Sequence, residues 1–294
     1  MEQRPLGATG LSVSAIGLGA GNIGGADVDD AAVDRLVGAA LDAGVTLIDT
    51  APSYGFSEER LGRALGGGRR DKVVLSTKVG YGVEGVPDWT AACIGPGIDA
   101  ALRRLCTDRI EVVHLHSCPL TVLEHAGVVE ALTRAVESGK VRVAAYSGEG
   151  DELLWAVRSG AFGAVQCSVS IVDQGALDGA VADAGRRGAG VIAKRALGNA
   201  PWRFQTRPRQ ADLADAWDRF RALAPDRGGL SWTALFARFA AFAEGISSAL
   251  IGTASPAHLA EACAAIAQGP LELVHIISLR EAFAAKGSGW PGRI

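Results

Sequence analysis

Residues 47–55 read Leu-Ile-Asp-Thr-Ala-Pro-Ser-Tyr-Gly. An apolar run of strand length, residues 45–48, ends at the carboxylate of Asp49, and a turn with Pro52 and Gly55 then presents the phenol of Tyr54. A strand that stops at such a turn directs the residues after it towards a shared rim. We therefore predict that Asp49 and Tyr54 are the first two residues of an active site.

Outward from this stretch, apolar runs of strand length alternate about eight times with longer stretches of helical composition. Short apolar runs are typical of parallel strands that are buried on both faces. An eightfold repeat without a linker-like change in composition favours a closed barrel over an open sheet. We predict one α/β domain over residues 1–294, a (β/α)8 TIM barrel. Its strands are expected at residues 15–18, 46–49, 73–78, 110–116, 141–146, 164–169, 190–194 and 247–251, and its helices at residues 30–43, 57–65, 97–105, 120–137, 151–159, 175–187, 230–244 and 256–268.

Composition and charge argue against several other classes of protein. A net charge of -3 over 294 residues, with scattered lysines and arginines, argues against a nucleic-acid partner. Residues 1–7 lack the pattern of a signal peptide, and no apolar run approaches the ~18 residues of a membrane helix. Five cysteines without a C-x-x-C pair suit free thiols in a reducing compartment. We expect a cytoplasmic protein without nucleic-acid or membrane partners; its oligomeric state stays open.

Two long segments depart from the repeat. Residues 80–94 follow the third predicted strand and include Tyr81 and Trp89, while residues 198–212 follow the seventh and include Trp202 and Phe204. Long loops at the C-terminal face of a barrel commonly hold substrate or cofactor, and we expect these two to do so. Ordinary surface loops are the alternative.

A glycine motif suggests a different fold. Gly19, Gly21 and Gly24 spell G-x-G-x-x-G after the first predicted strand, as in a dinucleotide-binding Rossmann fold. Three carboxylates follow within residues 25–30, where the next helix should receive a pyrophosphate, and acids there repel phosphate. Eight strands also exceed the six of a Rossmann sheet. We therefore disfavour that interpretation.

Lys78 ends the third predicted strand and His116 ends the fourth, so both should reach the rim that holds Asp49 and Tyr54. A phenol has an ordinary pKa of about 10 and is a poor acid at neutral pH unless a nearby cation stabilises its anion. Lys78 can supply that cation with Asp49 keeping it charged, while His116 can hydrogen-bond the oxygen on which negative charge develops. Together the four describe a Tyr general acid that protonates a carbonyl oxygen during hydride transfer. Considered singly, each residue also has a purely structural explanation; Asp49, for example, could cap a turn, and Lys78 could be a solvated strand end.

A metal site is an alternative use of the histidines. His114 and His116 are two apart on one strand and share a face, as metal ligands can. The last predicted strand ends without an acid to complete such a site, so we expect no metal. Cys118 is interpreted as a packing residue, because no motif pairs it with a base.

Several stretches resemble the aldo-keto reductase superfamily, and together they extend along essentially the whole chain. They are residues 44–55, 57–62, 76–80, 102–105, 108–111 and 115–116. The resemblance implies a TIM barrel, a nicotinamide cofactor bound without a Rossmann fold, and Asp49, Tyr54, Lys78 and His116 as the catalytic residues. It also implies that residues 4–11 form an N-terminal β-hairpin that plugs the bottom of the barrel.

The resemblance further implies a set of cofactor-binding residues. Ser147 and Gln166 match the residues that bind the nicotinamide amide. Leu197 and Gly198 match the backbone that meets the pyrophosphate, with Arg195 as an added cation.

The remaining cofactor residues match less closely. Gly252 and Thr253 precede a predicted helix whose start suits a phosphate. His258 takes the place of an arginine that often binds the 2′-phosphate, and Lys194 stands where many members stack an aromatic ring. The family favours NADPH/NADP as the cofactor, with NAD as an alternative.

We therefore expect an NAD(P)H-dependent aldo-keto reductase that interconverts an aldehyde or ketone and its alcohol, with that small molecule as its partner. The alternative is a cofactor-binding barrel that acts as a sensor or regulatory subunit with little turnover. Neither the substrate nor the direction of reaction follows from the sequence.

Overall fold

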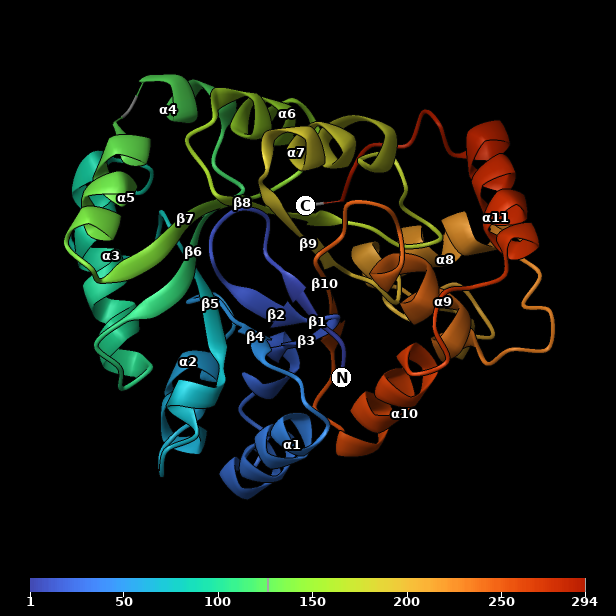
Figure 1. The fold of residues 1–294 in the computed structure, drawn as a ribbon, viewed down its shortest axis with the longest axis horizontal. Coiled ribbons are helices and arrows are strands. Elements are labelled where there is room, and N and C mark those ends of the chain that lie inside the picture. Colours follow the sequence, from blue (N-terminus) through green and yellow to red (C-terminus); the bar gives the residue numbers. More distant parts are fainter. Residues whose placement is uncertain (126, 294) are drawn as a thin grey trace.

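Eight parallel strands close into a barrel in the computed structural model, which describes residues 1–125 and 127–293. Each strand pairs with the next along the chain, and the last pairs with the first (Figure 1). The predicted (β/α)8 TIM barrel is confirmed, with strand boundaries within two residues of those expected. The strands are β3 (Ile16–Gly19), β4 (Leu47–Asp49), β5 (Val74–Val79), β6 (Ile110–His116), β7 (Val141–Ser147), β8 (Ala164–Ser168), β9 (Gly190–Lys194) and β10 (Ser248–Gly252).

Helices surround this barrel (Figure 1). Those in the predicted places are α1 (Asp30–Asp42), α2 (Ser57–Ala64), α6 (Gly150–Ser159), α9 (Trp232–Ala241) and α10 (Pro256–Ile266). No helix within residues 1–125 and 127–293 is long and apolar enough to span a bilayer.

Other helices differ from expectation. The helix predicted at residues 97–105 is α3 (Ala91–Arg104), which begins earlier and contains Pro96, although proline removes a backbone donor. The one predicted at 120–137 is two helices, α4 (Leu120–His125) and α5 (Val128–Glu137). The one predicted at 175–187 is a π-helical segment, η3 (Leu177–Val181), followed by α7 (Ala182–Arg187). Two further helices, α8 (Ala211–Leu223) and α11 (Leu273–Lys286), were not predicted, because they lie outside the one-helix-per-strand repeat.

The long connection after β9 is correspondingly less irregular than predicted. It contains the short helix η4 (Pro201–Arg203) and leads into α8. The segment after β5 stays irregular until α3 begins at Ala91.

An N-terminal hairpin closes one end of the barrel, as the family resemblance implied. Strands β1 (Gln3–Pro5) and β2 (Ser12–Ser14) pair antiparallel, and Figure 1 shows the hairpin lying across the barrel opening. Leu6, Leu11 and Val13 are buried against inward-facing residues near the strand starts, among them Leu47 and Val112. The bottom of the barrel is therefore apolar and filled.

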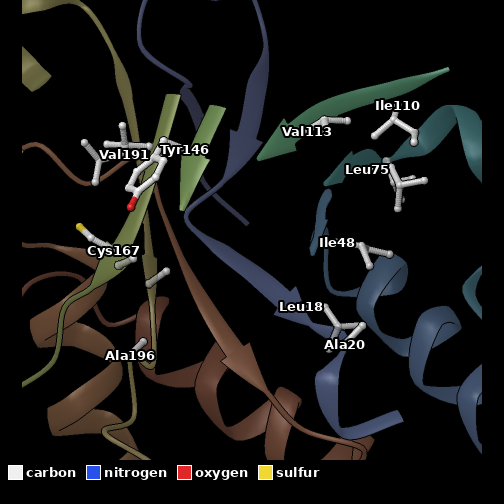
Figure 2. Close-up of a cluster of buried hydrophobic side chains, with 14 of the residues drawn as sticks. Leu18, Ala20, Ile48, Leu75, Ile110, Val113, Tyr146, Cys167, Val191 and Ala196 are labelled. Carbon is white, nitrogen blue, oxygen red and sulfur yellow. The ribbon is translucent and has the colours of Figure 1, made fainter. Parts of the chain in front are cut away.

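A larger apolar cluster lies between the barrel and its helices. Alternate strand residues such as Leu18, Ile48 and Leu75 belong to it (Figure 2). Burying each such side chain contributes about 1.5–3 kcal/mol relative to leaving it exposed. Because successive strand residues point to opposite faces, the residues between them point into the barrel.

The register of the strands brings the inward-facing polar residues to one level. Asp49 is paired with Ser76, Lys78 with His114, and His116 with Ser147. All lie towards the C-terminal ends of their strands, away from the hairpin. The barrel therefore has an apolar bottom and a polar top.

Candidate active site

Asp49 and Lys78 form a buried ion pair at the polar end of the barrel. Lys78 Nζ lies 2.7 Å from Asp49 Oδ2 and donates a second hydrogen bond of 2.7 Å to the Thr50 carbonyl. The side chain of Lys78 is 1% exposed and that of Asp49 is 5% exposed, so solvent barely screens the attraction between their charges. A lysine held in this way presents a fixed positive charge at the floor of the site.

The pKa values of the pair move in opposite directions. Burial, the largest single effect, would raise the pKa of Asp49, but the charge and hydrogen bond of Lys78, the nearby His114 and the hydrogen bond from Ser76 together lower it below its ordinary value. Burial, the largest single effect, would lower the pKa of Lys78, but the charge and hydrogen bond of Asp49 together with Tyr54 and Tyr81 raise it. Both groups are therefore charged at neutral pH.

Two neutral side chains complete the shell around Asp49. Ser76 Oγ donates to Asp49 Oδ1 at 2.7 Å, and Gln166 Nε2 donates to the same oxygen at 3.0 Å. Ser147 Oγ donates in turn to Gln166 Oε1 at 2.9 Å. The carboxylate thus has three contacts, from Lys78 and Ser76 on β5 and from Gln166 on β8, which fix its orientation.

The two histidines of β6 are held neutral. Burial, together with the charges of Lys78 and Lys194, lowers the pKa of His116 to about 3. Burial and Lys78 likewise lower the pKa of His114 to about 4. His114 Nε2 lies 3.1 Å from Ser76 Oγ, so His114 belongs to the hydrogen-bonded interior beneath the site. His116 faces the cavity above it.

Tyr54 lies directly over this charged floor. Lys78 Nζ is 5.2 Å from the centroid of the Tyr54 ring, and the rings of Tyr54 and His116 meet edge to face at 6.2 Å. The cation that stabilises a phenolate and the imidazole that can bind an oxygen are therefore both adjacent to the phenol. The structure brings the four predicted catalytic residues together.

A cavity of about 740 Å³ opens above these residues at the C-terminal face of the barrel. It is large enough for a cofactor-sized ligand. Three cations line it, Lys194, Arg195 and Arg203, whereas Asp49 is the one acid among the described lining residues. Its other lining residues include Gly19, Gly21, Asn22, Ser53, Tyr54, Tyr81, His116, Ser117, Gln166, Leu197, Asn199 and Gly252.

The predicted cofactor residues fall into two groups. Gln166, Lys194, Arg195, Leu197 and Gly252 line the cavity. The others lie beside it: Ser147 is buried beneath Gln166, Gly198 packs on Val172 and Phe236, and Thr253 and His258 stand at the start of α10.

Lys194 is held by a partner that was not expected. Its Nζ lies 3.2 Å from Glu149 Oε1, and Glu149 also accepts a 2.8 Å hydrogen bond from the Ser168 amide. Burial lowers the pKa of Lys194, and Glu149 offsets only part of that effect. Residue 194 is therefore a lysine paired with Glu149, at the place where many members of the family resembled have a stacking aromatic ring.

The start of α10 is already capped from within the chain. Ser255 Oγ accepts from the His258 amide at 3.5 Å, and Thr253 Oγ1 accepts from the Ser255 amide at 3.0 Å. The His258 side chain is exposed. Thr253 and His258 are therefore not among the described lining residues of the cavity, whereas Arg195 and Gly252 are.

Glu149, Ser53 and Arg203 were not expected at the site. Glu149 and Ser53 each follow a predicted strand by a few residues, and that position was the available signal. Arg203 and Tyr81 lie on the two long loops that were expected to form the walls of the site. The sequence indicated these loops but not which of their side chains face inward.

The closed barrel rules out a Rossmann fold for the glycine motif, since β3 pairs with β10 and β4. Within residues 1–125 and 127–293, the His, Cys, Asp and Glu side chains form no group of three or more that could hold a metal ion.

Comparisons with known proteins agree on one family. The Aldo/keto reductase family model matches residues 15–276. A solved structure from Pseudomonas aeruginosa, assigned as an aldo-keto reductase, is 31% identical and superposes with a TM-score of 0.73, covering 90% of this chain and 95% of that one.

Curated relatives give the same indication over a shorter span. Aldo-keto reductase YhdN of Bacillus subtilis is 37% identical over 158 residues, which cover 48% of this chain and 45% of the relative. L-galactose dehydrogenase of Arabidopsis thaliana is 34% identical over 157 residues, which cover 50% of this chain and 49% of the relative. The matched segments thus span about half the length of these relatives.

Proposed function

Because the chain belongs to the aldo-keto reductase family, we propose that it is a nicotinamide-dependent oxidoreductase that interconverts an aldehyde or ketone and its alcohol. One observation carries the proposal. The buried Asp49–Lys78 pair, 2.7 Å apart, is adjacent to the Tyr54 ring, and Asp49, Tyr54 and His116 line one cavity. This is the arrangement that proton donation by a phenol requires.

The residues of the cavity fit a dinucleotide. Arg195 and Arg203 supply positive charge suited to phosphates, whereas Lys194 is paired with Glu149, and Asp49, the one acid among the described lining residues, is paired with Lys78. Gly19 and Gly252 lie side by side, such that a β-carbon on Gly19 would be 3.4 Å from the Gly252 backbone. Side chains there would fill the wall of the cavity, so the glycines keep it open.

We assign the binding of the cofactor to Gln166, Arg195, Leu197 and Gly252 of the cavity wall, with Ser147 positioning the Gln166 amide. When bound, a reduced nicotinamide supplies the two electrons that the carbonyl carbon gains. The proposal covers NADPH and NADH alike.

The chain's own residues then handle the proton. The Tyr54 hydroxyl gives its proton to the carbonyl oxygen, and the Lys78 ammonium stabilises the phenolate that remains. Asp49 keeps Lys78 charged and in place. His116, being neutral, can donate a hydrogen bond from one ring nitrogen to the oxygen on which charge develops. In the oxidation of an alcohol, the same groups act in reverse.

Several polar side chains line the cavity. Asn22, Ser53, Tyr81 and Ser117 line it with amide and hydroxyl groups. These groups suit a small carbonyl compound that carries hydroxyls of its own, and one relative is an L-galactose dehydrogenase. We therefore propose a polar, hydroxylated substrate in preference to an apolar one.

We also propose that residues 1–294 form a single domain that acts in the cytoplasm. The hairpin packs with inward strand residues in one buried cluster, and outward strand residues pack with the helices in another, so the barrel joins all three. The five cysteines are all free, as expected for a reducing compartment.

Cofactor titration followed by a turnover assay tests the proposed activity. Wild type, Tyr54→Phe and Tyr146→Phe would be titrated with NADPH and NADH by tryptophan fluorescence, then assayed for cofactor oxidation with aldehydes and hydroxy-aldehydes. Tyr146 is the matched control because its hydroxyl bonds the Cys118 carbonyl outside the cavity. We expect all three proteins to bind cofactor and only Tyr54→Phe to lose turnover, by about 10²–10⁴-fold. Binding without any turnover that depends on Tyr54 would instead identify a sensor.

A further inference from the structure

The imidazole of His116 has a phenol as its immediate partner. His116 Nδ1 lies 2.6 Å from the hydroxyl of Tyr81, which is also 2.9 Å from Ser53 Oγ. The rings of Tyr81 and His116 are 5.6 Å apart. Because Nδ1 is engaged in this contact, Nε2 is the ring nitrogen left for a molecule in the cavity.

The loop after β5 holds Tyr81 in this position. The Trp89 ring packs 6.0 Å from the Tyr81 ring and covers Gly80, where a β-carbon would lie 2.1 Å from the indole. Gly80 has φ +126 and Trp89 has φ 60, both in the left-handed half of conformational space. The Trp89 amide also donates a 2.7 Å hydrogen bond to the Gly80 carbonyl. The position of the Tyr81 phenol is therefore set by the backbone and the packing of its own loop.

Tyr81 remains a proton donor at neutral pH. Burial raises its pKa above the ordinary value of a phenol, and the hydrogen bond with Ser53 and the charge of Lys78 offset only part of the rise. Its single hydrogen can turn towards either His116 or Ser53. The His116 nitrogen is nearer, and an imidazole lone pair is a better acceptor than an alcohol oxygen.

The identity of the protonated nitrogen matters for the reaction. A neutral imidazole carries one hydrogen, so one of its nitrogens donates and the other accepts. A carbonyl oxygen in the cavity needs a donor, and only the tautomer with hydrogen on Nε2 provides it. A hydrogen-bond donor at Nδ1 favours that tautomer.

We propose that Tyr81 is a positioning residue that donates its hydroxyl hydrogen to His116 Nδ1 and so holds His116 in the Nε2–H tautomer facing the substrate oxygen. The role rests on the proposed function, because it serves the oxygen that Tyr54 protonates. With this role, Tyr81 on the loop after β5 is a second tyrosine that serves the reaction, beside Tyr54 on the loop after β4.

Nitrogen NMR of histidine-labelled protein tests the tautomer directly. The protonated and bare nitrogens of a neutral imidazole resonate far apart, and the signals lost in His116→Gln identify His116 among the five histidines. At pH 7, without cofactor or substrate, we expect His116 to carry its hydrogen on Nε2 in wild type and in Tyr146→Phe. In Tyr81→Phe a substantial Nδ1–H population should appear. Wild type with hydrogen on Nδ1 would overturn the proposal even if no variant could be purified.

Kinetics test whether the tautomer matters for catalysis. One neutral hydrogen bond is worth up to about tenfold, so Tyr81→Phe should lower kcat by about tenfold with a smaller change in KM, while Tyr146→Phe should leave both unchanged. An altered tautomer with unchanged kcat, or an unaltered tautomer with reduced kcat, would each refute the positioning role.

The proposed function has its own separate readout. NMR needs no turnover, so it reports on Tyr81 whether or not a carbonyl is reduced. Turnover that survives in Tyr54→Phe would refute the proposed function while leaving the Tyr81–His116 contact as measured.

Discussion

A β-carbon on Gly24 would lie 1.6 Å from the carbonyl oxygen of Tyr54. The Phe56 amide donates a 3.1 Å hydrogen bond to the Gly24 carbonyl, which fastens the Tyr54 loop to the segment after β3. The last glycine of the G-x-G-x-x-G motif therefore allows the backbone to approach the proposed acid. Its neighbour Gly21 lies against the Tyr54 ring at an ordinary contact distance of 3.6 Å.

Replacing these two glycines should have unequal effects. Gly24→Ala places a methyl group inside the Tyr54 backbone and should destabilise the protein by about 1–3 kcal/mol or more, with loss of turnover. Gly21→Ala meets only van der Waals contact and should cost less than about 1 kcal/mol. Urea unfolding of both variants measures the difference. Equal stability of the two would show that the Tyr54 loop does not depend on close approach at residue 24.

The buried ion pair should be strongly coupled. Asp49→Asn or Lys78→Met leaves one charge buried without its partner, so each should lower the free energy of unfolding by about 3–5 kcal/mol. The double variant removes both charges and should lose less than the sum of the two single losses. A double-mutant cycle from urea unfolding gives the coupling energy. Additive losses would mean that the 2.7 Å contact contributes no interaction of its own.

The cations of the cavity should contribute to cofactor binding. Arg195 lines the cavity, whereas Arg187 is exposed at the end of α7. Arg195→Gln should weaken NADPH binding by about tenfold or more, because hydrogen bonds to a charged group are worth about 1.5–3 kcal/mol. Arg187→Gln should leave the affinity unchanged. Fluorescence titration at two salt concentrations would show a smaller salt dependence for Arg195→Gln, and the same affinity in both variants would argue against a phosphate near Arg195.

Acid should destabilise the fold partly through His114. Burial lowers the pKa of His114 from 6.5 to about 4, so between those values the unfolded chain binds a proton that the folded chain does not. The stability that this group contributes is present above pH 6.5 and is lost as the pH falls. At about 1.4 kcal/mol per pKa unit, the loss between pH 7 and pH 5 is about 2 kcal/mol.

The comparison of wild type with His114→Asn isolates this effect. Asp173 acts in the opposite direction, because burial raises its pKa to about 7 and the fold then loses stability as the pH rises towards neutral. Both proteins contain Asp173, so its contribution cancels in the difference. Wild type should lose about 2 kcal/mol more than His114→Asn between pH 7 and pH 5. Parallel pH profiles would indicate that the pKa of His114 is the same in the folded and the unfolded chain.

Much of the site was predictable from local pattern. Asp49, Lys78 and His116 each end an apolar run, and Gln166 lies on another. In a parallel barrel the C-terminal ends of all strands meet at one face, so strand-end residues converge even though they are far apart in the chain. The period of two along each strand then decides which of them point inward.

Contacts between loops were not predictable in this way. The sequence placed Tyr81 on a long loop, but its contact with His116 depends on the left-handed backbone at Gly80 and on the packing of Trp89. The pairing of Glu149 with Lys194 joins the segments after β7 and β9, which no local pattern connects. The helices α8 and α11 were missed because they fall outside the repeat on which the prediction relied.

By itself, then, the sequence determined the eight strands, their inward residues and the family, because hydrophobic period and short motifs are local properties of the chain. Only the tertiary structure decided which side chain on each loop meets the catalytic residues. That choice depends on where loops of different strands pass one another, and their backbone conformations are set by packing between segments distant in sequence.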